Sequence, residues 1–133
     1  MEKTRHAEKS LYANYLKKAE EYFGAMNDEF AKRNFDSCAL CAIHCCISSA
    51  DALTIFFKGV RHAGERHEDA VKLLRTLELD QNLLQNKTRQ FLNVLNVKNA
   101  VEYEEKLTTE NGALTAIQNT ERFFNWIKET LSK

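Results

Sequence analysis

The sequence contains no proline, only four glycines and no net charge, and each of these absences narrows its interpretation. Without proline and with little glycine, few positions would interrupt a helix. Because 19 Lys and Arg residues balance 19 Asp and Glu residues, composition alone does not indicate a surface that binds nucleic acid through its phosphates. A length of 133 residues suits a single domain, residues 1–133, that folds without disulfides or metal.

The sequence also lacks the features that direct a chain into or across a membrane. We identify no apolar run that approaches the ~20 residues needed to span a bilayer. The charged N-terminus, residues 1–6, has no apolar signal-peptide core. Hydrophobic residues make up 44% of the chain, too many for a disordered segment. We therefore expect a folded cytoplasmic protein that does not bind membranes.

Apolar residues recur at helical spacing in five segments, and no segment alternates with period two, which predicts an all-α fold without strands. The expected helices span residues 5–33, 37–58, 66–77, 81–106 and 110–131. The expected N-caps are Asp36 or Ser37, Asp80, and Thr108 or Thr109. Residues 59–64 form the clearest predicted loop, with a glycine at each end. Short connections favour an up-and-down antiparallel bundle of four or five helices.

The segment 37–58 stands out because small residues occupy two adjacent stripes of the predicted helix. Small side chains let neighbouring helices approach closely, so we expect this helix at the centre of the bundle. It also contains Asp51 among small and apolar neighbours, and a buried carboxylate needs a partner.

All four cysteines, Cys38, Cys41, Cys45 and Cys46, lie in this helix, and with His44 they offer ligands for zinc or an iron–sulfur cluster. On an ideal helix, however, the first three sulfurs spread over roughly 10 Å of axis. Zinc–sulfur bonds are only ~2.3 Å long, so a site requires sulfurs that converge. We therefore interpret the cysteines as small core residues and expect no metal or cofactor, with a metal or redox site as the alternative.

Several stretches, taken in order, resemble the HEPN superfamily of small helical domains. They are SADAL at residues 49–53, GVRHAGERH at residues 59–67, AVKLL at residues 70–74, LNVKNAVEY at residues 95–103 and ERFFNWI at residues 121–127. The resemblance extends from about Tyr12 to Leu131. It implies an antiparallel bundle of four or five helices that forms a homodimer. It also implies nucleotide or RNA as a ligand and, as in toxin–antitoxin pairs, a small nucleotidyltransferase-like partner protein.

Many HEPN proteins are ribonucleases that carry an Arg, a polar residue after it, and a His four to six residues beyond the Arg. In the matching stretch of this sequence, Lys98 replaces the Arg, Asn99 matches the polar residue and Tyr103 replaces the His. A tyrosine with a reference pKa near 10 is a poor general base at pH 7. The resemblance is therefore to a non-catalytic branch, and a divergent ribonuclease is the alternative.

Two groups of residues are candidate binding sites. The first consists of Asp51, Lys98, Asn99 and Tyr103, in which the resemblance suggests one of the last three residues as the partner of the aspartate. The second is a candidate anion site at the start of the third helix and consists of Arg61, His62, Arg66 and His67. In the alternative interpretation, RNA cleavage would use Arg61 or Arg66 with His67, because Arg61 and His67 formally fit the ribonuclease spacing. It could equally use Lys98 with Tyr103.

The only tryptophan, Trp126, falls off the main apolar stripe of the last predicted helix. Tryptophan is enriched at the centres of protein interfaces, so we expect Trp126 to anchor the dimer. The aromatic residues of the first and last helices otherwise suit the core. From sequence alone they show no clear interleaving with basic residues on one exposed face, as a nucleic-acid stacking surface would require.

Overall fold

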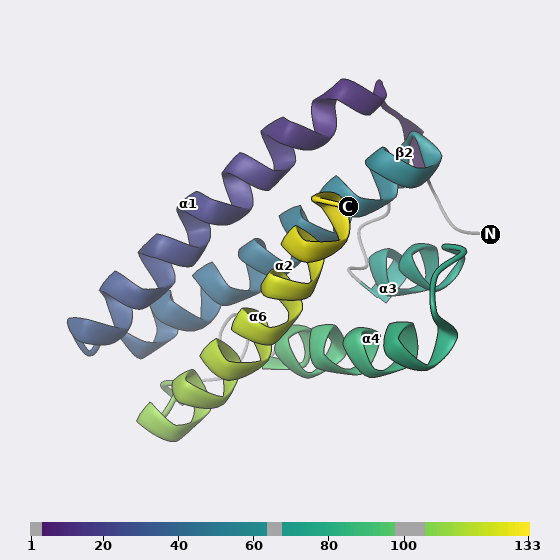
Figure 1. Cartoon of the computed structure of the whole chain (residues 1–133). Coiled ribbons are helices and arrows are strands. Elements are labelled where there is room, and N and C mark those ends of the chain that lie inside the picture. Colours follow the sequence, from purple (N-terminus) through teal and green to yellow (C-terminus); the bar gives the residue numbers. More distant parts are fainter. Residues whose placement is uncertain (1–3, 64–67, 98–105) are drawn as a thin grey trace.

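A computed structural model describes residues 4–63, 68–97 and 106–133 and confirms the all-α bundle (Figure 1). In chain order its elements are β1 (Thr4–His6), the 3-10 helix η1 (Lys9–Leu11), α1 (Tyr12–Ala31), α2 (Phe35–Lys58), β2 (Val60–His62), α3 (Glu68–Arg75), α4 (Gln81–Leu95) and α6 (Glu110–Leu131). Helices α1 and α2 lie side by side and run in opposite directions, while α6 crosses them at an angle. Helices α3 and α4 complete the bundle on the other side of α6.

Helix α2 is the central helix, as its small residues predicted. It packs against α1, α3, α4 and α6. Its alanines and three of its four cysteines are buried, which leaves room for rings from the neighbouring helices. Phe91 of α4 stacks on Phe123 of α6 with ring centroids 4.9 Å apart, and both rings are fully buried.

The predicted caps are confirmed for two of the three helices concerned. Asp80 accepts a hydrogen bond from the Leu83 amide at 3.0 Å, and Thr109 accepts one from the Gly112 amide at 2.9 Å. At α2 the prediction is wrong, because the helix begins two residues earlier and its N-cap is Asn34. The Asp36 carboxylate instead accepts a hydrogen bond from the Thr108 amide at 2.7 Å, which ties the start of α2 to the segment before α6.

At the N-terminus two predictions are wrong: the first helix does not begin at residue 5, and the chain does contain strands. Residues 4–6 form β1, which pairs with β2 in an antiparallel ribbon, and α1 begins only at Tyr12. Gly59 makes this possible because it ends α2 in the left-handed conformation, with φ of 66°, and its carbonyl accepts a hydrogen bond from the Ala7 amide at 2.8 Å. The predicted loop at residues 59–64 therefore contains a strand.

Two expectations about apolar residues also need correction. Among the described residues, α2 is long and apolar enough to cross a membrane by length and composition, contrary to our reading of the sequence. Within the bundle, however, 72% of its most apolar window is buried, as in a core helix. Trp126 is not an exposed anchor either, because its side chain is only 7% exposed and lies against Phe123.

Candidate functional site

A buried carboxylate–imidazole pair lies where α2 meets β2. Asp51 is 5% exposed on α2, and its Oδ1 lies 3.0 Å from Nδ1 of His62, which is 6% exposed. An ionised carboxylate can only accept a hydrogen bond, so Asp51 in that form pairs with the ring tautomer that carries its proton on Nδ1. The contact gives each of the two buried side chains a polar partner, which a buried polar group requires.

The ribbon of β1 and β2 determines which side chain reaches the aspartate. Successive side chains of a strand point to opposite faces, so His62 and Arg61 cannot both point inward. His62 takes the buried face, whereas Arg61 is half-buried on the other face and its guanidinium lies 5.8 Å from the ring centroid of Tyr15. Nη1 of Arg61 also donates a hydrogen bond to the carbonyl of His62 at 3.1 Å.

These positions bring together two residues that were predicted to belong to different sites, Asp51 and His62. Asp51 is buried and partnered, as expected, but the partner that the structure identifies is His62, which we had assigned to the anion site. The expected partners Lys98, Asn99 and Tyr103 lie outside the described residues. Arg66 and His67 of the predicted anion site also lie outside them. Arg61 and His62 belong to that site in sequence, but they face opposite sides of the ribbon.

Sequence reasoning missed the pair because β2 is only three residues long. Three residues are too few to show period-two alternation, and its strand partner begins 56 positions earlier, at Thr4. The one usable signal was the buried aspartate itself, since a histidine shortly after the end of the same helix can fold back onto it. Nothing in the local pattern of residues 4–6 predicts that they pair with β2.

The cysteines lie in the core, in agreement with the interpretation of small packing residues. Cys38, Cys45 and Cys46 are fully buried and Cys41 is half-buried, and all four are free thiols. Burial, helped by the nearby Cys41 and Glu29, raises the pKa of Cys38 to about 11. Burial likewise raises the pKa of Cys46 to about 12, although a hydrogen bond to Thr120 opposes this, and raises the pKa values of Cys41 and Cys45. Such thiols are weak nucleophiles and weak metal ligands near neutral pH.

The sequence matches no protein-family model and no curated protein. The resemblance to the HEPN superfamily therefore depends on the quoted stretches, and any function has to be argued from the geometry of this chain. That geometry is a small helical bundle with a buried aspartate–histidine pair and a half-buried arginine on the opposite face of the same ribbon.

We expect the Asp51–His62 pair to be coupled energetically. In a double-mutant cycle of Asp51→Ala, His62→Ala and the double variant, the coupling free energy should be about 0.5–3 kcal/mol, because removing one partner leaves the other buried without this hydrogen bond. Urea unfolding of the wild type and the three variants, monitored by circular dichroism and Trp126 fluorescence, gives the three changes in the free energy of unfolding. Effects that add to within about 0.5 kcal/mol would show that the two residues stabilise the fold independently.

The raised thiol pKa values predict a loss of stability at alkaline pH. In the unfolded chain thiols ionise at pH ~8.5, whereas the buried thiols of the folded chain stay protonated to higher pH. Their contribution to the free energy of unfolding is therefore fully present below pH ~8.5 and is lost as the pH rises toward 11. Between these values we expect the free energy of unfolding to fall more steeply in the wild type than in Cys38→Ala. Tyrosines and lysines titrate equally in the two proteins, so their effect cancels when the wild type is compared with Cys38→Ala. Equal slopes of the free energy of unfolding against pH would contradict the prediction.

Proposed function

We propose that this protein is a small HEPN-like helical domain that acts as a homodimer by binding a nucleotide, a nucleic acid or a partner protein, without cleaving RNA. A nucleotidyltransferase-like protein is the partner that the resemblance suggests. The proposal begins from the sequence, in which Lys98 and Tyr103 replace the Arg and His of the ribonuclease motif.

The observation that carries the non-catalytic part is the position of His62. A general base must come within hydrogen-bond reach of the proton that it removes. The His62 imidazole is 6% exposed and its Nδ1 is engaged with Asp51, while Arg61 lies on the opposite face of the ribbon. Arg61 and His62 thus do not combine into an arginine–histidine pair that faces one substrate.

The distribution of exposed apolar residues supports the homodimer. Among the large hydrophobic side chains of the described residues, Leu107 is by far the most exposed, at 79%. Phe57 at 45%, Leu83 at 41% and Leu114, near the start of α6, at 40% follow it. A contiguous apolar patch that is left open to water on a folded domain commonly marks a protein interface. We therefore propose the N-terminal end of α6, with the neighbouring Leu107, as the dimer contact.

Incubation of the purified protein with total RNA tests the absence of catalysis. We expect no cleavage over a range of pH values and divalent metals, because the sequence lacks the His of the motif and His62 is engaged in the core. Variants His67→Ala and Lys98→Ala serve as controls for trace contamination. Cleavage by the wild type that either substitution abolishes would refute a non-catalytic role and favour the divergent ribonuclease.

Sedimentation velocity at micromolar concentration tests the homodimer. We expect the wild type to sediment as a dimer and Leu107→Glu to sediment as a monomer, because a carboxylate at the contact would lose its hydration without a partner. Leu83→Glu, at an exposed leucine of α4, is the matched control and should remain dimeric. A monomeric wild type would rule out this part of the proposal.

A further inference from the structure

One flank of α1 combines aromatic and basic side chains with neighbours from α2 and the strand ribbon. Tyr15, Lys18 and Tyr22 recur at spacings of three and four residues, so they lie on one side of α1. The Tyr15 ring has the Lys18 ammonium at 5.2 Å and the Arg61 guanidinium at 5.8 Å from its centroid. The basic–aromatic flank, as we name it, consists of Arg5, Tyr15, Lys18, Tyr22, His44 and Arg61.

At one end of the basic–aromatic flank, two arginines lie directly opposite each other. Arg5 of β1 is the cross-strand partner of Arg61 of β2, so both side chains lie on the face of the ribbon away from the buried His62. Like charges at such positions destabilise a strand pair. Within the described parts of the chain, no carboxylate forms an ion pair with Arg5, Lys18 or Arg61. The fold thus keeps a repulsive pair that an anion would relieve.

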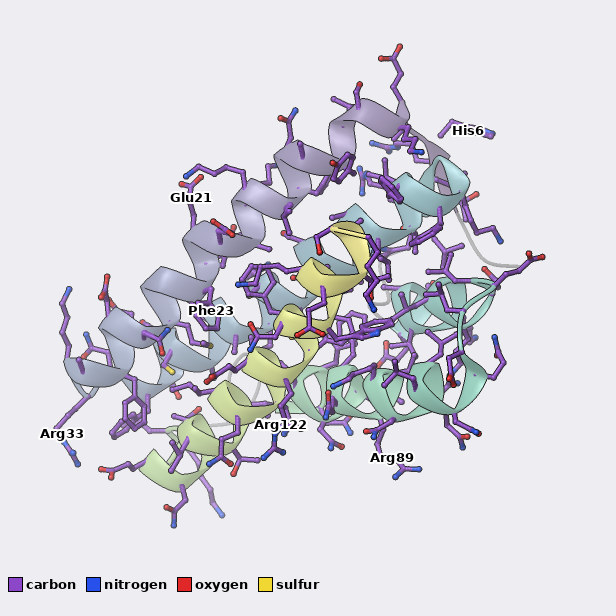
Figure 2. All side chains as sticks on the ribbon, in the orientation of Figure 1. His6, Glu21, Phe23, Arg33, Arg89 and Arg122 are labelled. Atoms are coloured by element: carbon purple, nitrogen blue, oxygen red, sulfur yellow. The ribbon has the colours of Figure 1, made fainter. Side chains whose placement is uncertain are left out.

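The chain segments that carry the two arginines are rich in positive charge, although the whole chain is neutral and α3, which packs against β2, begins with Glu68 and Asp69. Residues 4–18 and 56–62 carry six Lys and Arg side chains and one carboxylate, Glu8. The next carboxylates along α1 belong to Glu20 and Glu21, and Figure 2 shows Glu21 projecting from α1 into solvent. Glu29, farther along, is already engaged by Lys32 and Asn34. Such a concentration of positive charge is complementary to a polyanion.

At the other end of the basic–aromatic flank, Tyr22 stacks on His44 of α2. The ring centroids are 5.3 Å apart and the planes are inclined by 27°. Tyr22 is 37% exposed and His44 is also exposed, so the stacked pair is open to solvent. An open aromatic surface beside cations is the arrangement on which unpaired bases stack.

We propose that the basic–aromatic flank binds single-stranded nucleic acid. Arg5, Lys18 and Arg61 contact phosphates, and a base stacks on the Tyr22–His44 pair. This inference rests on the proposed function, since it specifies the ligand of a domain that binds without cleaving. It keeps Arg61 from the anion site predicted from sequence but replaces His62 by Arg5 and Lys18, which lie on the accessible side.

The composition of the flank favours single strands over the other polyanions. A membrane surface would require several exposed aliphatic side chains beside the cations, whereas the exposed large hydrophobic residue of the flank is Tyr22. Leu11 and Phe57, which are exposed in the adjoining segments, are not part of the flank. In a duplex the bases stack on one another and are not free to stack on a protein ring. A single strand offers both its phosphates and its bases.

Fluorescence anisotropy with a labelled oligouridylate of about 12 nucleotides tests the inference directly. At about 50 mM salt we expect Arg5→Gln/Arg61→Gln to lose roughly tenfold or more in affinity and to lower the salt dependence by about two charges. Tyr22→Ala should lose roughly fivefold or more, whereas Tyr22→Phe keeps the ring and its affinity. Lys72→Gln/Arg89→Gln, which removes two exposed positive charges from α3 and α4, is the matched control and should bind like the wild type.

Several results would overturn the inference. The first two are no binding of the oligonucleotide by the wild type and an equal loss of affinity in the control variant Lys72→Gln/Arg89→Gln. The others are tighter binding of a duplex whose affinity does not change in Tyr22→Ala, and binding to phosphatidylserine vesicles alone. Circular dichroism of each variant separates a lost contact from a lost fold, and Arg5→Lys/Arg61→Lys should restore most of the affinity if charge is what matters.

If the oligonucleotide binds but the flank variants do not weaken its binding, this inference fails and the proposed function stands. RNA cleavage would refute the proposed function whatever the flank variants do.

Discussion

The close packing around the small residues of α2 is the constraint on which the rest of the structure depends. Alanines and cysteines on α2 let α1 and α6 approach, and rings such as Phe123 and Phe124 fill the space that remains. A larger residue on α2 would separate the helices, because protein interiors have little free volume to absorb it. The same packing explains the cysteine cluster, whose thiols are buried and resist ionisation, as the raised pKa of Cys38 shows.

This packing would exclude a charged side chain unless a partner reached it, and Asp51 meets that requirement through His62. The aspartate thereby fixes the position of β2, since the imidazole has to point inward. Once His62 points inward, strand geometry makes Arg61 point outward, and the pairing with β1 brings Arg5 beside it. The buried Asp51–His62 pair and the outward-facing arginines of the flank therefore both follow from one three-residue strand.

Sequence reasoning succeeded where many residues repeat one signal. The stripe of α6 predicted its bounds, 110–131, and the small residues of α2 predicted its central place. It failed where the signal was short or distant, as for β1 and β2, whose pairing joins residues more than fifty positions apart. Sequence reasoning predicted correctly that Asp51 is buried with a partner. It did not predict His62 as that partner, because the face to which a side chain points follows from a strand that the sequence did not reveal. Trp126 was misjudged because α4 covers the part of α6 that lies beside the main stripe.

The ribbon of β1 and β2 also connects α1 and α2 at the end opposite the turn that joins them. At one end the two helices are joined by the short turn at residues 32–34, and at the other the pairing of residues 4–6 with 60–62 fixes their relative height. Two antiparallel helices joined at a single end can slide by a turn against each other and exchange one set of contacts for another. With both ends fastened such a slip would break the strand pairing, so the hairpin has a single register, and Tyr22 meets His44 rather than a residue one turn away.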